Sequence, residues 1–463
     1  MSQVQAVKPT TAGRPTPVQV LKTKAETALA EAFTQVERQL PGGDWLRQLR
    51  RAAAGAFAAE GLPHRRVEEW KFTDLRAMMR EAYPLASQRP GVLSAPAIAD
   101  SVRSGLPGAD LSKAFAVFVD GVGVAENGLP DVSEADRPFL AALADHPPAW
   151  LENEITEISH HVDDGVLALN TALFADGGVI DIADGREIET PIALFFTDAG
   201  GAAQTVATRN VVRVGKGAKV VLVECHLAPS APRQVNTLTQ IVLGDGAEVV
   251  HVKLVASREG SIHLGRTVTR LGAKASYKPF QMVVGDGMVR NDLAITFRGQ
   301  HSSFDLGAAK LTNAHGHADT TLVVDHAVPH CTSRELVKCV LADTARAVFQ
   351  GKVIVRPDAQ KTDGKQMAQA LMLSPDAEFD SKPELEIYAD DVICGHGSTS
   401  AEIDPDLVFY LQSRGIPREE AQAILVESFI GEAIDKVENE DVQEALRGIA
   451  RQWLSRETGR KQS

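Results

Sequence analysis

Val214–Val220 reads VGKGAKV, and Leu243–Val249 repeats its glycine pattern as LGDGAEV at a step of 29 residues. Two further glycine turns follow, at Leu271-Gly272 and at Arg298-Gly299, at steps of about 26 and 27 residues. The runs between these turns are rich in β-branched residues and show no helical pattern. Strands that recur with turns at near-constant spacing, without intervening helices, predict a β-solenoid rather than a βαβ sheet.

The strand predicted after the first turn, from Lys219 onward, has two faces that can be compared. After Lys219, side chains alternate between faces, and both faces are largely apolar. One face would carry Val221, Val223 and Cys225, and the other Val220, Leu222 and Glu224. A large antiparallel sandwich also has short strands and glycine turns, so it is the alternative fold.

Composition and residue pattern divide the chain into four parts. Residues 1–17 are rich in Gln, Thr, Pro and Gly, which predicts a disordered tail. Residues 18–165 are expected to be mainly helical, residues 166–403 to form the β core, and residues 404–463 to form a C-terminal helical domain. The fold class is therefore mainly β, with a solenoid core flanked by two helical regions.

Within the N-terminal part, helices are predicted around Leu29–Leu40 and over Trp45–Glu60. Tyr83–Ser112 is rich in Pro, Gly and Ser, with prolines that would cut any helix short, so we expect a loop or linker there. A brief strand at Ala116–Val119 and a helical stretch between about residues 134 and 161 complete this region.

Charge, cysteine usage and hydropathy exclude several functional classes. The chain of 463 residues carries 61 acidic and 48 basic residues, a net charge of −13 that disfavours nucleic acid and anionic membranes as partners. The four cysteines show no paired framework, which fits a reducing compartment. There is no signal peptide and no apolar run long enough to span a membrane, so we expect a cytoplasmic protein.

Cys394 and His396 are the candidate metal ligands. On a strand, residues i and i+2 project from the same face, so the thiol and the imidazole would point together. These two side chains select zinc, copper or iron–sulfur species. No other Cys or His lies within twenty residues on either side, so the remaining ligands must come from distant sequence or from another subunit. The alternative is a packed thiol beside an exposed imidazole.

The sequence around this pair resembles a known family. The segment 389–397 has the pattern Ala-Asp-Asp-x-x-Cys-x-His-Gly, and 409–415 reads FYLQSRG. Together they resemble the C-terminal signature of the SufB/SufD family, the scaffold subunits of the SUF iron–sulfur cluster assembly machinery. Segments 348–353, 359–362, 371–374 and 383–387 follow the family order as well, and the resemblance spans about residues 60 to 440.

Two features make the chain look like SufD rather than its paralogue SufB. The N-terminal stretch Glu68-Glu69-Trp70-Lys71 is similar to the SufD version. SufB relatives tend to carry His-Glu-Ala where this chain has His396-Gly397-Ser398, together with an upstream cysteine, and residues 340–393 contain no Cys. A SufB paralogue is the alternative within the family.

The resemblance implies a fold, partners and a role for the candidate ligands. It implies a right-handed parallel β-helix between helical regions, paired with SufB through the β-helix and with the ATPase SufC through the C-terminal helices. The family residue that matches His396 lies at the SufB interface and acts with a SufB cysteine, and Cys394 matches a nearby family cysteine. The implied cofactor is a transient iron–sulfur cluster, or iron, shared with SufB. A homodimer in the absence of SufB is a further expectation.

The last sixty residues predict amphipathic helices. Asp404 is the expected N-cap of a short helix with Pro405 in its first turn and Gly415 past its end, and Pro417 opens the next. Apolar residues at helical spacing in this second helix either pack on the chain itself or bind a partner. The family resemblance favours a partner interface at four of them: Ile424, Leu425, Phe429 and Ile434.

No phosphate-binding loop of the G-x-x-x-x-G-K-[ST] type occurs in the chain. Gly215-Lys216-Gly217 and Gly351-Lys352-Val353 lack the spaced glycines and the hydroxyl, and we interpret both as solenoid turns. We therefore expect a non-catalytic scaffold that binds no nucleotide, with the ATPase activity supplied by the SufC partner.

Other polar clusters are weaker candidates. Cys225 is expected to be a core thiol beside a surface imidazole at His226. His326, His330 and Cys331 fit a polar corner better than a metal site, because Pro329 precludes a regular helix there. The remaining clusters, which we interpret as turns, are His315-Gly316-His317 and Asp390-Asp391.

Two functions from other classes remain as alternatives. β-Solenoids often act as carbohydrate lyases or hydrolases, but such enzymes are usually exported and this chain has only 5% aromatic residues for stacking on sugars. A structural adaptor that binds partners and no metal is the other alternative.

Overall fold

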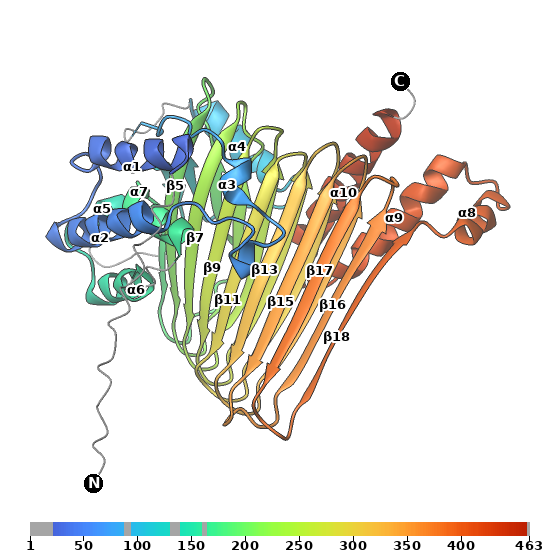
Figure 1. The fold of residues 1–463 in the computed structure, drawn as a ribbon. Helices are drawn as coiled ribbons and strands as arrows, with labels where there is room; N and C mark the ends of the chain where they lie inside the picture. Colours follow the sequence, from blue (N-terminus) through green and yellow to red (C-terminus); the bar gives the residue numbers. More distant parts are fainter. Residues whose placement is uncertain (1–21, 88–93, 130–138, 160–163, 461–463) are drawn as a thin grey trace, which may run out of the picture.

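The computed structural model describes residues 22–87, 94–129, 139–159 and 164–460. Its core is a flattened parallel β-solenoid built from two facing sheets (Figure 1). The strands are β1 Phe115–Val119, β2 Val122–Asn127, β3 Val179–Ile182, β4 Ile192–Thr197, β5 Gln204–Val214, β6 Lys219–His226, β7 Arg233–Leu243, β8 Glu248–Ser257, β9 Ile262–Leu271, β10 Ser276–Gly285, β11 Met288–Phe297, β12 Ser303–Thr312, β13 His317–His326, β14 Thr332–Leu341, β15 Arg346–Val355, β16 Asp363–Met372, β17 Glu378–Ile387 and β18 Ile393–Glu402.

Helices flank the solenoid at both ends of the chain, as the sequence predicts. The short α3 and the 3₁₀ helix η1 belong to a segment that crosses from the N-terminal helices to the sheet. The helices are α1 Lys24–Val36, α2 Asp44–Glu60, η1 Glu68–Trp70, α3 Leu75–Met78, α4 Ala95–Gly105, α5 Leu140–Leu143, α6 Ala149–Ser159, α7 Gly165–Leu173, α8 Pro405–Gln412, α9 Arg418–Ile434 and α10 Glu440–Arg460.

Successive strands alternate between the two sheets. The ten-stranded sheet runs in the order β18-β16-β14-β12-β10-β8-β6-β4-β1-β2, and the eight-stranded sheet in the order β17-β15-β13-β11-β9-β7-β5-β3. From β3 onward, paired residues are 26 to 32 positions apart, from Ile262 with Met288 to Arg346 with Glu378. The period that the glycine turns indicate is therefore one turn of a parallel solenoid, and the sandwich alternative is excluded.

The repeated glycines make the corners. Gly217 and Gly246 have φ of +64° and +70°, in the left-handed region that favours glycine. In the next turn Lys274 takes the same conformation, with φ of +58°, and its amide donates to the carbonyl of Gln300 in the following turn. The corners thus stack on one another.

The central strands of the ten-stranded sheet are buried on both faces, as β6 shows. In β6, Val220 and Leu222 lie in the core between the sheets, whereas Val223 and Cys225 lie in a second core outside the sheet. That outer core is covered by α4, α9 and α10, which contribute residues such as Val102, Ile430 and Leu446. The predicted alternation in β6 is therefore confirmed.

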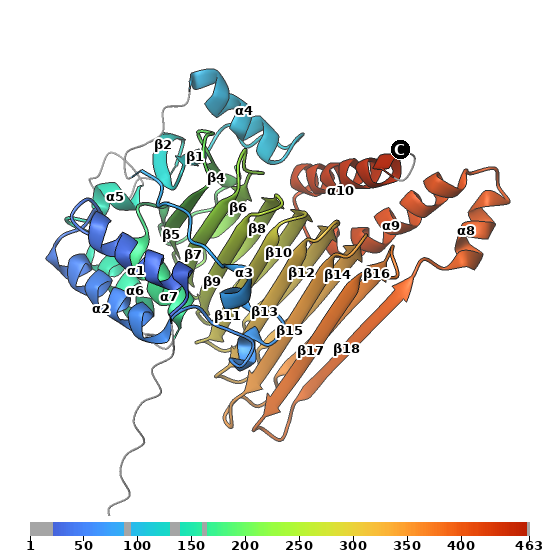
Figure 2. The same cartoon turned by 45° about the horizontal axis from the view of Figure 1, so that its top comes forward.

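The two ends of the solenoid differ. At the N-terminal end, β1 pairs with β4 and then forms a hairpin with β2, while α2 and α7 pack together beside β5 and β7. At the C-terminal end, β17 and β18 are the last strands of their sheets, and no described strand pairs with their outer edges. Figure 2 shows β17 and β18 at this end, with α8 beyond them.

The structure differs from the sequence expectation at several positions. Gly351-Lys352-Val353, expected to be a turn, lies within β15. Residues 95–105 form α4 inside the segment expected to be a loop, because Ser94 caps the helix and Pro96 lies in its first turn, where proline is tolerated. Residues 165–173 form α7 inside the range expected to be β, with Asp164 as its N-cap. The tail predicted for residues 1–17 lies outside the described residues.

Among the described residues, no helix combines the length and apolar character that crossing a bilayer would need.

The segment after α2 anchors the N-terminal region to the solenoid. The guanidinium carbon of Arg290 on β11 lies 3.9 Å from the centre of the Trp70 ring. Arg290 also pairs with Asp292 at 2.9 Å and with Asp319 at 2.6 Å, and the Thr73 hydroxyl donates to Asp319 at 2.5 Å. Asp319 is fully buried, so this contact fixes the segment to the outer face of the eight-stranded sheet.

Replacing Asp319 by Ala should destabilise the fold by roughly 3 kcal/mol, because a buried ion pair that loses one partner leaves an uncompensated charge. The free energy of unfolding, measured with urea and followed by circular dichroism, tests this. Asp325→Ala on the same strand is the matched control: its partner Arg356 is half exposed, so its loss should cost less than about 1 kcal/mol. Equal losses in the two variants would contradict the anchor.

Candidate metal centre at the open end of the solenoid

Cys394 and His396 lie on the last strand of the ten-stranded sheet, β18, which pairs with β16 on one side. Cys394 is paired with Gly364 and His396 with Gln366. Cys394 is half-buried against the core between the sheets, whereas His396 is exposed. The inner face of β18 therefore presents a thiol and, two residues further on, an imidazole that solvent or another protein can reach.

The surroundings of Cys394 keep its thiol protonated. Burial raises the pKa of Cys394, and the backbone hydrogen bond at Gly364 opposes this. The carboxyl groups of Asp363 and Glu335 raise the pKa further. A bound cation would reverse this effect, because metal coordination deprotonates a thiol.

The described part of the chain holds no group of three His, Cys, Asp or Glu side chains placed to bind a metal ion. As candidate ligands, Cys394 and His396 would therefore form an incomplete set. Completing it requires a movement of side chains or ligands from another molecule.

Behind His396, the pairing of strands aligns two polar side chains inside the solenoid. Glu335 on β14 pairs with Gln366 on β16, which pairs with His396 on β18. We call these three residues the Glu335 ladder. Glu335 and Gln366 are buried, and neither side chain makes a hydrogen bond of normal geometry. Burial raises the pKa of Glu335 to about 8, against weaker lowering by Ser333. Sequence reasoning missed both residues.

A second polar cluster lies inside the solenoid, toward its N-terminal end. Its geometry shows that the expectation of a surface position for His226 is wrong. His226 is buried, not on the surface, and its ring donates to Glu224 at 2.6 Å. Lys253 lies 2.9 Å from the same carboxyl oxygen, and Thr239 donates to the other at 2.9 Å. Burial alone would raise the pKa of Glu224, but Lys253 and the hydrogen bonds of His226 and His251 hold it well below its usual value. The cluster is internally compensated.

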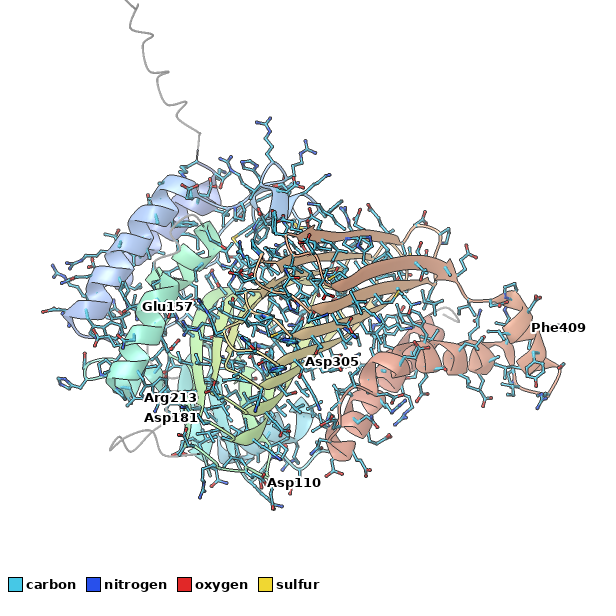
Figure 3. The ribbon with its side chains drawn as sticks, turned by 90° about the horizontal axis from the view of Figure 1, so that it is seen from below. Asp110, Glu157, Asp181, Arg213, Asp305 and Phe409 are labelled. Atoms are coloured by element: carbon cyan, nitrogen blue, oxygen red, sulfur yellow. The ribbon has the colours of Figure 1, made fainter. Side chains whose placement is uncertain are left out.

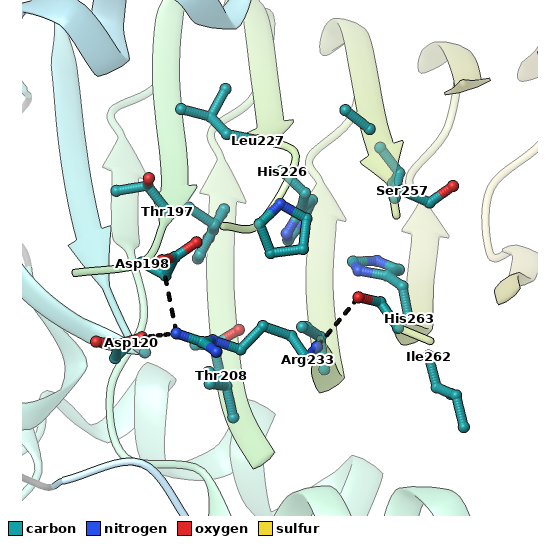
Figure 4. Close-up of a pocket in the computed structure, with 18 of the residues that line it drawn as sticks. Asp120, Thr197, Asp198, Thr208, His226, Leu227, Arg233, Ser257, Ile262 and His263 are labelled. Carbon is teal, nitrogen blue, oxygen red and sulfur yellow. Dashed lines mark hydrogen bonds and ion pairs between the residues drawn. The ribbon is translucent and has the colours of Figure 1, made fainter. Parts of the chain in front are cut away.

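A pocket of about 70 Å³ opens beside this cluster (Figure 4). Its floor includes His226 and His263, whose rings meet edge to face at 4.5 Å between centroids. At its side, Arg233 pairs with Asp120 at 3.4 Å and Asp198 at 3.5 Å. The arginine is thus neutralised, and the pocket has room for water or a ligand of a few atoms.

The other histidine candidates are dispersed. His326 is buried at the end of β13 and packs on Phe297, while His330 is exposed at the next corner. Cys331 is buried with its thiol toward backbone carbonyls. His317 starts β13 and lies 2.9 Å from the hydroxyl of Thr73. His330 lies at a corner, as the sequence predicts, whereas His317 and His326 are buried residues of strand β13 and not turn or corner groups.

The candidate interface residues on α9 lie in different environments. Ile424 is exposed and Leu425 is half-buried. Phe429 is half-buried, with the Lys338 ammonium 4.4 Å from its ring centre. Ile434 is completely buried against the ten-stranded sheet, so it packs within this chain.

Helix α8 has a larger exposed apolar surface than α9. Leu407, Phe409 and Tyr410 are all exposed, and Phe409 at 72% is the most exposed of them. Figure 3 shows Phe409 at the tip of α8, away from the solenoid. Asp404 caps the helix by accepting from the amide of Asp406 at 2.9 Å, as predicted.

Comparison with known proteins assigns both halves of the chain to the same family. Residues 195–429 match the family described as SUF system FeS cluster assembly, SufBD core domain, and residues 23–194 match the SufBD protein N-terminal region. An iron–sulfur cluster assembly SufBD family protein of Synechocystis is 31% identical over 414 residues, which cover 86% of this chain and 89% of the relative.

Two relatives named SufD are also similar over most of their length. SufD of Escherichia coli is 27% identical over 83% of this chain and 88% of its own. SufD of Bacillus subtilis is 23% identical over 87% of this chain and 92% of its own.

Buried histidines make the stability of the fold depend on pH. Burial lowers the pKa of His326 to about 4, although Asp325 raises it slightly, so the folded state stays neutral where the unfolded chain already takes a proton. The unfolded state therefore binds more protons between about pH 6.5 and 4, and stability falls as the pH falls through this window. From pH 7 to pH 5, His326 should account for a loss of roughly 2 kcal/mol.

Urea unfolding of the wild-type chain and of His326→Phe at pH 7 and pH 5 measures this loss. Between pH 7 and pH 5, His326→Phe should lose roughly 2 kcal/mol less stability than the wild type. His146→Phe, which removes an exposed imidazole, should behave as the wild type. An unchanged pH dependence in His326→Phe would contradict the assignment.

Proposed function

The chain belongs to the SufB/SufD family of SUF iron–sulfur cluster assembly proteins, and from this we propose that it is the SufD-like scaffold subunit of a SufB–SufC–SufD complex. It works in the cytoplasm, holds iron or a nascent cluster together with SufB, and leaves ATP hydrolysis to SufC. The observation that carries the proposal is the placement of Cys394 and His396 on the inner face of a terminal strand whose outer edge pairs with no described strand.

The open end of the solenoid supports pairing with SufB. Strand edges expose unpaired backbone donors and acceptors, which favour pairing with another chain. At this end Ile387, Tyr388 and Ile393 are exposed, and Tyr388 reaches 60%. A partner that covers this surface also covers Cys394 and His396, so pairing and ligand completion would occur in one step. In the absence of SufB, two copies of this chain are proposed to pair through the same edge.

The C-terminal helices support docking of SufC. The apolar residues of α8, together with Ile424 and Leu425 on α9, lie outside the part of α9 that packs against β12 and β14. Phe429 completes the proposed surface from the edge of that contact, because it is half-buried and lies against Lys338 of β14. The rest of α9 is fixed to the solenoid by Ile430 and Ile434, which are fully buried. A movement of the docked ATPase would therefore be transmitted to the outer face of the ten-stranded sheet. Ile434 itself is left out of the proposed surface.

Two sequence features support SufD rather than SufB as the subunit. The chain has His396-Gly397-Ser398 in place of the His-Glu-Ala motif, and it has no cysteine between Cys339 and Cys394. On this assignment the cysteine that works with His396 belongs to the SufB subunit.

The two partner surfaces can be separated by mutation. Phe409→Asp should lower binding of SufC by about tenfold or more and leave SufB binding intact, because a charge placed in an apolar contact is desolvated without a partner. Tyr388→Asp should lower binding of SufB and leave binding of SufC intact. Co-purification and isothermal titration with each purified partner measure both effects, and each variant serves as the control for the other.

If Phe409→Asp weakened binding of SufB as well, or if neither variant weakened binding of its expected partner, the assignment of the two surfaces would be wrong. Circular dichroism of both variants establishes that the fold is intact.

The metal role is tested by His396→Ala and Cys394→Ala in the complete complex. His396→Ala should reduce iron and acid-labile sulfide per complex about tenfold or more, as expected for loss of a ligand. Ser398→Ala, which removes an exposed side chain two residues further along the same face of β18, is the matched control and should retain full cluster content. A normal cluster content in His396→Ala would exclude this residue from the mechanism.

A further inference from the structure

A cavity of about 630 Å³ lies between the N-terminal region and the outer face of the eight-stranded sheet, and we call it the sheet cavity. Its walls are the beginning of α7 and the segment from the end of α2 to Trp70. The register of β9, β11 and β13 aligns an apolar and a polar row of half-buried side chains on its floor: Val268, Ala294 and Val323, then Arg266, Asp292 and Thr321. This volume is in the range of pockets that bury a bound molecule, so the described residues leave an apolar part of the sheet uncovered.

The charge of the lining favours a cationic occupant. Carboxylates outnumber guanidinium groups four to two: Glu60, Glu69, Asp164 and Asp292 against Arg266 and Arg290. Both arginines are paired within the cavity, Arg266 with Asp164 at 2.5 Å and Arg290 with Asp292 at 2.9 Å. The excess of negative charge therefore lies on the two exposed glutamates. An occupant that is apolar in its middle and basic at one end fits this surface.

The described part of the chain begins beside the sheet cavity. The ammonium group of Lys22 donates to the carbonyl of Ala59 at 2.9 Å. Glu26 on α1 accepts from the amide of Leu62, a residue of the cavity wall, at 2.9 Å. The start of α1 is thus fixed to the end of α2, and residues 1–21 join the fold at this point. Because an extended chain of 21 residues spans up to roughly 70 Å, the whole cavity is within their reach.

The sequence of residues 1–21 matches the lining in charge and in apolar character. It contains two basic residues, Lys8 and Arg14, and no acidic residue. Residues 14–20 read RPTPVQV. The two prolines favour extended backbone, and two valines that are two positions apart on such backbone project from the same side. A segment whose composition predicts disorder in isolation becomes ordered where a site fits it.

We propose that residues 14–21 of this chain occupy the sheet cavity, with Val18 and Val20 against the apolar row of its floor. Arg14 lies eight residues before Lys22, and Glu69 lies at the far end of the wall from the point of entry, so Glu69 is its partner. The occupied cavity would close the gap between the N-terminal helices and the sheet. The proposal is independent of the metal role and of both family matches, which begin at residue 23.

Alkylation of one engineered thiol in the full chain tests the proposal. Cys394→Ser removes the half-buried thiol and leaves three buried ones, and Val18→Cys adds the probe. Ala294→Trp fills the cavity from its floor. The thiol at position 18 should react with iodoacetamide, an uncharged reagent, about tenfold or more slowly than in the Ala294→Trp chain, because docking buries it and a filled cavity does not admit it. Mass spectrometry measures both rates.

Two controls make the comparison specific to the cavity. Thr296→Trp changes the same outer face of β11 outside the lining, so the thiol at position 18 should stay slow in this variant. A thiol placed by Ser2→Cys, outside the proposed contact, should react fast in every background. If the thiol at position 18 reacts as fast as the one at position 2, or if Ala294→Trp leaves its rate unchanged, the segment does not occupy the cavity.

Exchange of charges tests the ion pair without filling the cavity. Arg14→Glu and Glu69→Arg should each speed alkylation at position 18 about twofold to fivefold, the size expected for an exposed ion pair. The two substitutions together should restore the slow rate, since the pair then re-forms with its charges reversed. If the combination stays fast, or if neither single variant changes the rate, Glu69 is not the partner of Arg14.

Discussion

The in-register hydrogen bonding of parallel strands is the constraint on which the rest of this structure depends. Each turn places its residues directly over the equivalent residues of the turn before, so side chains form continuous rows along the solenoid. Corners must stack for the rows to stay aligned, which explains why the same left-handed conformation recurs at Gly217, Gly246 and Lys274. The rows also bring groups together that are some thirty residues apart, as Glu335, Gln366 and His396 show.

The two polar clusters of the interior differ in how their charges are compensated. Around Glu224, a lysine, a histidine and a threonine hydroxyl all contact one carboxylate, so that cluster is complete within the chain. Around Glu335 no such partners are present among the described residues. The carboxylate of the first cluster is compensated within the chain, although Nζ of Lys253 and Nε2 of His263 make no hydrogen bond of normal geometry with the described residues. The second cluster lies near the open end of the solenoid.

Local patterns in the sequence predict the repeated elements of this fold and fail where the position in the solenoid matters. Glycine spacing at 215–217 and 244–246 predicts the solenoid but leaves an antiparallel sandwich as the alternative, whereas the spacing of Cys394 and His396 is sufficient to place both on one face of a strand. Helix α4 was missed because its proline falls in the first turn, where it starts a helix rather than ending one. His226 was placed on the surface because one face of its strand was assumed to meet solvent. Both faces of β6 are buried, one between the sheets and one under helices.

Glu335 and Gln366 carry no local signal, since their relation to His396 appears only when the length of each turn is known.

The last turn also has a thermodynamic consequence for the cargo. Strand β18 has a hydrogen-bonded neighbour on one side only, and most of its side chains are exposed. Such a terminal strand opens locally at a lower free energy than the strands at the centre of the sheet, and its amide protons exchange faster. Under the proposed function, each opening would expose Cys394 and His396 to solvent and release an ion held by them. A subunit docked on β18 would suppress this fraying, so that retention of the ion would depend on assembly.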